Sequence, residues 1–218
     1  MMNDTNLNKK KVNTNLIHNI FPFWLKLLYS VFFFTTIYAN ISYYGVSSFL
    51  WLCHFALVLL FFGMWFENKM ILSMMALTSI PFYISWSVLF IIDILTDISF
   101  ESIAYMFEPS LPTLLRGVSL FHIFLPIFIL FILFEIGYNP NIFYLQSIIG
   151  MVILILTYLD SPELNINWVY GIGSPQNIVH PILYLILLMI ALIFIVYLPT
   201  HLTLSHFFKK RNTLEKNL

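Results

Sequence analysis

The chain has 218 residues, of which 60% are hydrophobic and only 9% are charged, and its mean hydropathy is +0.89. Soluble domains are roughly 45–50% apolar and about 25% charged, so this chain has too few polar side chains to coat a water-soluble globule. The composition excludes a soluble enzyme, a disordered segment and a nucleic-acid-binding domain. Ten basic and ten acidic residues cancel, so the net charge says nothing about partners. We therefore expect an all-α integral membrane protein.

The first twenty residues are polar, rich in asparagine and lysine, and lack the apolar stretch and small-residue site of a cleaved signal peptide. We expect residues 1–20 and the basic residues 209–218 to be cytosolic tails on either side of one transmembrane domain, residues 21–208. The single cysteine, Cys53, excludes a disulfide framework and a thiolate metal cluster. We expect no bound metal or cofactor.

Six long apolar runs follow the first tail. They lie near residues 22–40, 46–66, 70–92, 112–136, 141–160 and 178–200. A helix needs about 20 residues to cross roughly 30 Å of hydrocarbon. A membrane barrel would instead show segments of about ten residues with alternating polarity. Because the runs are continuous, they predict a six-transmembrane-helix bundle.

Lysine and arginine predict the orientation of this bundle. Basic residues precede the first run and follow the last, at Lys9, Lys10, Lys11, Lys209, Lys210, Arg211 and Lys216. The two long connections are acidic, and the first has no basic residue before Arg116. The positive-inside rule therefore puts both termini in the cytosol and the long connections outside. Residues 93–111 also carry Phe100 and Phe107, which predicts a short amphipathic segment over the outer mouth, with an ordinary interfacial loop as the alternative.

Polar side chains within the runs are candidates for chemistry, because polarity is costly in lipid. At 1.5 Å per residue, Cys53 lies ~10 Å and His122 ~15 Å below the outer surface. Asn165 and Asn167 would point the same way if their loop is extended. We expect these four residues to be catalytic and to line one outer-leaflet cavity. Further candidates, for substrate binding at similar depth, are His54, Trp86, Asp93, Arg116, Ser119, Trp168 and His180.

A thiol beside an imidazole is suited to acyl transfer through a thioester, because the imidazole takes the thiol proton. An asparagine can orient the ring or donate to an oxyanion. Each residue also has a plain structural alternative. A lone cysteine in a span is usually a small packing residue, and His122 is then a hydrogen-bonded structural histidine. His54 faces about 100° away from Cys53 on a helix, and His180 is equally an interfacial residue at a helix start.

Three short motifs carry a resemblance to a known family. They are Leu-Trp-Leu-Cys-His at residues 50–54, His-Ile-Phe-Leu-Pro at 122–126 and Asn-Ile-Asn-Trp-Val at 165–169. In order and spacing they resemble the YwaF-like integral membrane proteins, whose eukaryotic relatives are ether-phospholipid acyltransferases. The resemblance covers roughly residues 45–205. It is closest to a group of bacterial membrane proteins that share Tyr105–Pro109, Asn165–Val169 and Tyr197–Leu202.

The resemblance implies about six spans and a location in a bacterial inner membrane. It also implies catalytic roles for Cys53 and His122, with the asparagine pair at Asn165 and Asn167. The leading hypothesis is therefore a membrane-embedded lipid acyltransferase or acyl-ester hydrolase, whose partners are membrane lipids. Two hypotheses stay open beside it. One is a small-solute carrier or channel lined by the same residues. The other is a haem protein with two axial histidines, His54 and His122 or His122 and His180.

Overall fold

The structure, a computed structural model, describes residues 20–96, 98–160 and 162–208, and these ranges contain helices and loops but no strand. Apart from Ile20, both expected tails lie outside the described residues. The α-helices are α1 (Phe23–Tyr44), α2 (Leu52–Phe66), α3 (Lys69–Leu95), α4 (Thr113–Ser119), α5 (Phe121–Ile136), α6 (Phe143–Leu159), α7 (Pro181–Ala191) and α8 (Leu198–Phe207). A π-helix, η6 (Leu192–Tyr197), joins α7 to α8. Short 3₁₀ turns are η1 (Val46–Leu50), η2 (Ala104–Met106), η3 (Pro140–Ile142), η4 (Pro162–Leu164) and η5 (Ile166–Trp168).

Five helices in the described ranges are long and apolar enough to cross a membrane, which fits an integral membrane protein. They are α1, α3, α4 with α5, η3 with α6, and α7 through α8. The second apolar run folds differently. It forms η1, a break at Trp51, and then the 15-residue helix α2. Fifteen residues rise only ~22 Å, less than the ~30 Å of hydrocarbon. The sixth span therefore stays a prediction.

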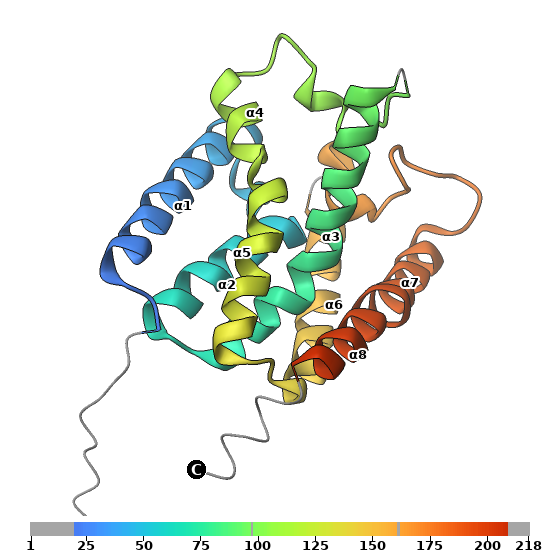
Figure 1. Cartoon of the computed structure of the whole chain (residues 1–218). Coiled ribbons are helices and arrows are strands. Elements are labelled where there is room, and N and C mark those ends of the chain that lie inside the picture. Colours follow the sequence, from blue (N-terminus) through green and yellow to red (C-terminus); the bar gives the residue numbers. More distant parts are fainter. Residues whose placement is uncertain (1–19, 97, 161, 209–218) are drawn as a thin grey trace, which may run out of the picture.

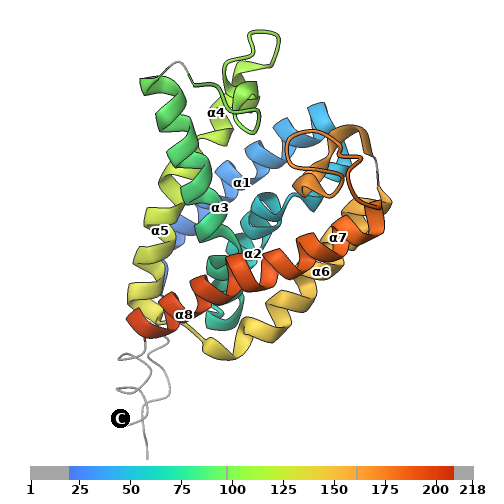
Figure 2. The ribbon, with the colours of Figure 1, turned by 90° about the vertical axis from the view of Figure 1, so that its right-hand side faces the viewer.

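The helices alternate in direction between two ends of the molecule (Figure 1). The described chain begins and ends at the same end as the turns between α2 and α3 and between α5 and α6. The connection that contains η2 lies at the opposite end. Figure 2 shows α6 and the α7–α8 helix side by side as a hairpin next to α3. Both ends of the described chain therefore lie at the same end of the bundle. The cytosolic location of that end stays a prediction.

The surface of the spans is apolar and the interior carries the polar groups. Large hydrophobic side chains are exposed along α1, such as Trp24 at 64% and Tyr38 at 68%, and along α5, such as Ile127 at 70%. Only 17% of the apolar stretch of α7–α8 is buried within the protein. Such faces suit contact with lipid chains. By contrast His54, His122 and Gln146 are buried.

The sharp turn between α2 and α3 is fixed by polar groups. Glu67 has a left-handed backbone, with φ of 50°, and the Asn68 side chain accepts hydrogen bonds from the amides of Met70 and Ile71, which caps α3. Lys26 of α1 forms an ion pair with Glu67 at 2.7 Å. Burial acts to raise the pKa of Glu67, but the Lys26 hydrogen bond and two backbone amides outweigh burial and hold that pKa below its ordinary value.

The connection from α3 to α4 is not an amphipathic helix. Its only helical part among the described residues is the three-residue turn η2. Ile103 is fully buried and Phe107 stacks on Phe90 of α3 with ring centroids 5.8 Å apart. The connection therefore packs onto the end of α3 at these two residues, although Phe107 is also 46% exposed.

Candidate functional site

Both sequence motifs with a candidate histidine begin at a break between two helical segments. Trp51 is extended, with φ −60° and ψ 127°, and separates η1 from α2. Leu120, with ψ −8°, separates α4 from α5. A break leaves backbone carbonyl groups near the helix end without their usual amide partners. Each of the two breaks therefore offers a hydrogen-bond acceptor inside the bundle.

An imidazole uses a carbonyl at each break. His54 Nδ1 lies 2.8 Å from the carbonyl oxygen of Ser48, and His122 Nδ1 lies 2.8 Å from the carbonyl oxygen of Ser119. A carbonyl can only accept, so in both neutral rings Nδ1 carries the proton. Nε2 of each ring then holds a lone pair. This is the tautomer that a general base or a metal ligand requires.

His122 lies within a cluster of aromatic rings. It stacks on Trp86 of α3 at 4.6 Å and 21°, and on its neighbour Phe121 at 4.0 Å and 22°. Tyr83 meets the His122 ring edge-on at 5.1 Å. Phe121 also lies 6.1 Å from His54. These contacts fix the plane of the His122 ring and bring both histidines to one ring, Phe121.

Tyr83 connects this cluster to the cysteine. Its hydroxyl donates to the carbonyl oxygen of Cys53 at 2.8 Å, while its ring packs on His122. Cys53 is a free, half-buried cysteine. Among the described residues no hydrogen bond joins the Cys53 thiol to His122. The structure therefore brings the two residues to the same aromatic side chain without a direct contact between sulfur and nitrogen.

Asn167 holds the break that precedes Cys53. Its side-chain oxygen accepts from the Leu52 amide at 3.0 Å, and its nitrogen donates to the Leu50 carbonyl at 2.6 Å. The same nitrogen also donates to the Thr157 hydroxyl of α6 at 3.2 Å. The amide therefore supplies the backbone partners that Leu50 and Leu52 lose at Trp51. Asn167 positions the start of α2, and with it Cys53.

Asn165 stabilises its own loop. Its nitrogen donates to the carbonyl oxygens of Gly171 and Gly173, and its oxygen accepts from the Tyr170 amide. The backbone is not extended here, since φ is 40° at Asn165 and 53° at Asn167, so the condition for the two side chains to point the same way is not met. The two side chains consequently point to different partners, and both amides are engaged with groups other than His122.

Three further candidates lie near the C-terminal end of α3 and in α4. Asp93 accepts from the Phe100 amide at 3.3 Å, which ties the following loop to α3. The Arg116 guanidinium donates to the Met106 carbonyl at 3.4 Å, a long bond. The Ser119 hydroxyl donates to the Leu115 carbonyl one turn earlier, and is buried. The Ser119 and Trp86 side chains lie at the Tyr105 hydroxyl, whose pKa is raised by burial.

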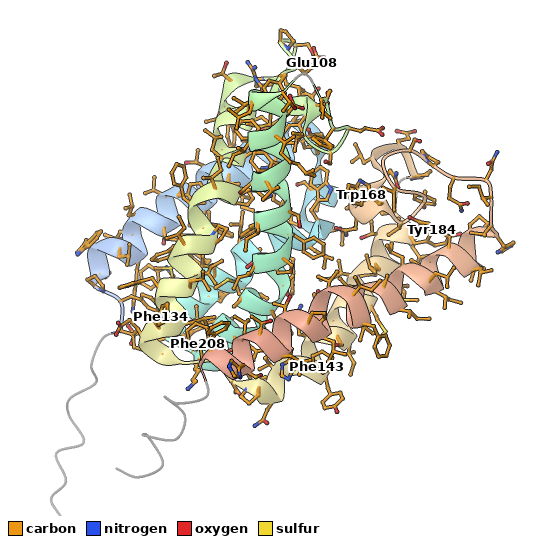
Figure 3. All side chains as sticks on the ribbon, turned by 45° about the vertical axis from the view of Figure 1, so that its right-hand side comes forward. Glu108, Phe134, Phe143, Trp168, Tyr184 and Phe208 are labelled. Carbon is orange, nitrogen blue, oxygen red and sulfur yellow. The ribbon has the colours of Figure 1, made fainter. Side chains whose placement is uncertain are left out.

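The two remaining candidates lie outside the aromatic cluster. Trp168 is 40% exposed, on the loop labelled in Figure 3. His180 is exposed, and its Nδ1 accepts from the Ile182 amide at the start of α7. The start of α7 and the α4–α5 junction lie on different sides of the molecule in both views (Figures 1 and 2). His180 therefore caps a helix and is not placed to share a ligand with His122.

The sequence did not identify the aromatic residues Tyr83 and Phe121, which organise the site. A tyrosine or phenylalanine in an apolar run gives no sign of a functional role. The signal for Tyr83 was its spacing, since it falls on the helical stripe between Ser79 and Trp86.

Metal binding has no support in the described part of the chain, where no group of three histidine, cysteine or acidic side chains is gathered closely enough to hold an ion. Comparison with known protein families, with curated proteins and with solved structures gave no match.

Proposed function

We propose that the protein is a membrane-embedded enzyme that transfers or hydrolyses lipid acyl groups, with Cys53 as nucleophile and His122 as general base. The observation that carries the proposal is the arrangement around Tyr83, whose hydroxyl binds the Cys53 backbone and whose ring packs on His122. His122 contributes a proton-free Nε2, because Nδ1 donates to Ser119. The apolar surroundings and the lipid-facing spans favour a substrate that reaches the site from the membrane.

The chemistry would proceed in two steps. His122 Nε2 takes the thiol proton of Cys53, the sulfur attacks the acyl carbonyl carbon, and the carbon–oxygen bond of the ester breaks. The departing alkoxide takes the proton from His122 and leaves as an alcohol. In the second step the hydroxyl of an acceptor, or water, gives its proton to Nε2 and attacks the thioester. The thiolate leaves and takes back the proton.

This mechanism requires Cys53 Sγ and His122 Nε2 to approach when substrate binds. Hydrogen bonds of catalytic pairs are often long in the absence of substrate and tighten in the complex. In this proposal Asn167 has a positioning role, because its amide is bound at the start of α2. Asn165 supports the neighbouring loop and takes no part in the chemistry.

The haem alternative is less well supported. Axial ligation needs two Nε2 atoms on opposite faces of a flat macrocycle, and the Phe121 ring already contacts both His54 and His122. The pair of His122 and His180 is disfavoured by their separation in the fold. The carrier alternative has no specific observation in its favour at this site.

The test is an acyl-transfer and hydrolysis assay on the purified full chain in lipid nanodiscs. Fatty acyl esters and phospholipids would serve as donors, with water or lysophospholipid as acceptor. We expect Cys53→Ala and His122→Gln each to abolish turnover, and the double variant to be no worse than either, since the residues act as a unit. Cys53→Ser should also be inactive, because the mechanism needs a thiol.

The matched control is His54→Gln, which changes the other buried imidazole at the same phenylalanine. It should retain turnover if the fold survives, as checked by thermal unfolding. Full activity in Cys53→Ala would overturn the thioester mechanism. Haem binding would be favoured by two results together. His54→Gln and His122→Gln would lose turnover equally, and wild-type protein purified from haem-supplied cells would absorb in the Soret region.

A further inference from the structure

A second group of buried polar side chains lies away from the cysteine and histidine motifs. Gln146 of α6, Tyr197 of η6 and Thr78 of α3 are each 0% exposed. The Tyr197 hydroxyl lies beside the side chains of Gln146 and Thr78. Among the described residues, however, neither the Gln146 amide nor the Tyr197 hydroxyl has a hydrogen bond of good geometry. Three buried polar atoms are therefore without a partner.

Unpaired polar atoms of this kind are unusual in a folded protein. Each one costs about 1–3 kcal/mol relative to a hydrogen-bonded or apolar group. Several buried hydroxyls in the spans avoid this cost. Thr78 and Ser147, for example, donate to the carbonyl one turn earlier in their own helices. Gln146 and Tyr197 are thus exceptions that another molecule would relieve.

The π-helix places Tyr197 at this point. Pro199, in the first turn of α8, has no amide proton to give to the Ile195 carbonyl. The π turn over Leu192–Tyr197 directly precedes this turn. Tyr197 then packs against Gly150 of α6, where an added Cβ would lie 2.9 Å from the Tyr197 hydroxyl. Single π turns within helices are frequent at functional sites.

An apolar hollow borders the same two elements. It has a volume of about 420 Å³, within the range of small-molecule sites. Its lining residues come from α6 and from the η6–α8 junction: Phe143, Tyr144, Ser147, Ile148, Met151, Ile193, Phe194 and Leu198. Phe143 marks the place where α6 passes α8 in Figure 3. Ser147 follows Gln146 and Leu198 follows Tyr197 along the chain, so the hollow and the unpaired group adjoin the same helix contact.

We propose that this region is a second ligand site, which binds a neutral single-chain lipid by its hydroxyl head. The head would bind Gln146 and Tyr197, and the acyl chain would lie in the hollow between α6 and η6. The Gln146 amide offers both a donor and an acceptor, and so does the Tyr197 hydroxyl, which matches an alcohol. Thr78, Gln146 and Tyr197 carry no charge, so a charged head would be buried there without a counter-ion.

The site is independent of the thioester chemistry proposed above. It uses α6 and η6, and Thr78 lies about 12 Å along α3 from Trp86 at 1.5 Å per residue. Loss of catalytic activity in Cys53→Ala should therefore leave lipid binding at Gln146 and Tyr197 unchanged.

Photo-crosslinking tests the site directly. The probe is a monoacylglycerol with a diazirine in its acyl chain, added to the full chain in nanodiscs and mapped by mass spectrometry. We expect crosslinks in the peptides that contain Phe143–Met151 and Ile193–Leu198, and competition by monooleoylglycerol but not by oleate or hexadecane. Gln146→Leu and Tyr197→Phe should each lower crosslinking about tenfold. Ser85→Ala is the matched control, because this hydroxyl lies outside the hollow and donates to the Pro81 carbonyl of its own helix.

Thermal unfolding without the probe separates a ligand site from a structural one. Replacing an unpaired buried amide by an apolar side chain is neutral or stabilising, so Gln146→Leu should keep or raise the melting temperature. A fall in melting temperature would show that the amide is already paired within the protein, and would overturn the proposal. Equal crosslinking of wild type, Gln146→Leu and Tyr197→Phe would also overturn it, as would competition by hexadecane.

Discussion

The two regions that bury polar side chains in this protein satisfy them differently. Around Cys53, the side chains of His54, His122 and Asn167 bind backbone groups at helix breaks. Around Gln146, α6 is unbroken, and the buried amide has no partner among the described residues. A helix break leaves carbonyl oxygens that a buried ring or amide can reach. Within a continuous helix, short hydroxyl side chains such as Thr78 and Ser147 reach the carbonyl one turn earlier, whereas the Gln146 amide makes no such bond.

The largest effect that this comparison predicts is at Asn167. Replacement by alanine removes the bonds to Leu50, Leu52 and Thr157, and it leaves the Leu50 carbonyl and the Leu52 amide without these partners at Trp51. We expect the free energy of unfolding to fall by about 2–4 kcal/mol, measured by denaturant unfolding in detergent. A loss of activity with unchanged stability would contradict the positioning role and indicate that the amide acts on substrate.

Asn141 offers the control for that experiment. It is exposed on the three-residue turn η3, so Asn141→Ala should change the free energy of unfolding by no more than about 0.5 kcal/mol. A similar loss in both variants would mean that asparagine replacement as such destabilises the detergent-solubilised protein.

The next effect concerns close packing in the region around Gln146, where α6 meets η6. Gly150→Ala would put a methyl group 2.9 Å from the Tyr197 hydroxyl and 3.2 Å from Leu192. We expect a loss of about 1–3 kcal/mol and weaker crosslinking by the monoacylglycerol probe. Gly117→Ala is the counterpart on α4, where the added methyl meets no atom within 4 Å, and it should be neutral or slightly stabilising. If the two changes lowered the free energy of unfolding equally, the close packing of α6 against η6 would not be the cause of the loss.

A smaller effect is expected at Tyr83, which joins the cysteine and histidine elements. Tyr83→Phe keeps the ring on His122 and removes only the hydroxyl that binds the Cys53 carbonyl. The stability should fall by about 1 kcal/mol. Turnover should fall further than this stability loss explains, because Cys53 is then less well placed. Unchanged turnover would show that the Cys53 backbone needs no support from Tyr83.

The sequence predicted the fold class and the position of the long helices, because continuous apolar runs identify membrane-length helices without reference to tertiary contacts. It did not predict the break at Trp51, which depends on Asn167, more than a hundred residues away in the chain. Local sequence contains no sign of such a partner. The asparagine loop is not extended for a related reason: Asn165 and Asn167 accept a left-handed backbone more readily than most residues, and tertiary contacts select that conformation.

The candidate site was predicted in part. Counting residues along the predicted helices put His122 and Trp86 at similar depth in the membrane, and in the structure their rings are stacked. Depth alone could not tell that His180 caps α7 on another side of the molecule. Gln146 escaped notice because a single glutamine near the start of an apolar run reads as an interfacial residue. Gln146 is buried beside Tyr197, a contact between distant parts of the sequence that only the folded chain reveals.

The smallest effect is predicted for the ion pair between Lys26 and Glu67. This polar contact depends on two side chains of opposite charge, and neither a helix break nor a ligand takes part in it. Their side chains are 12% and 15% exposed, and a pair of this kind contributes about 0.5–1 kcal/mol.

Lys26 holds the pKa of Glu67 below its ordinary value of 4.5. The unfolded chain therefore takes up the proton first as the pH falls, so the stabilisation is complete above pH 4.5 and is lost as the pH falls through the lower pKa of the folded state. Melting temperatures of wild type and Glu67→Gln should differ at pH 7 and converge at acidic pH. Lys26→Met should remove the same difference, and the double variant should add nothing further. A difference that persists unchanged at acidic pH would show that Glu67 acts through its backbone amide partners, Ile20 and Phe21, and not through its charge.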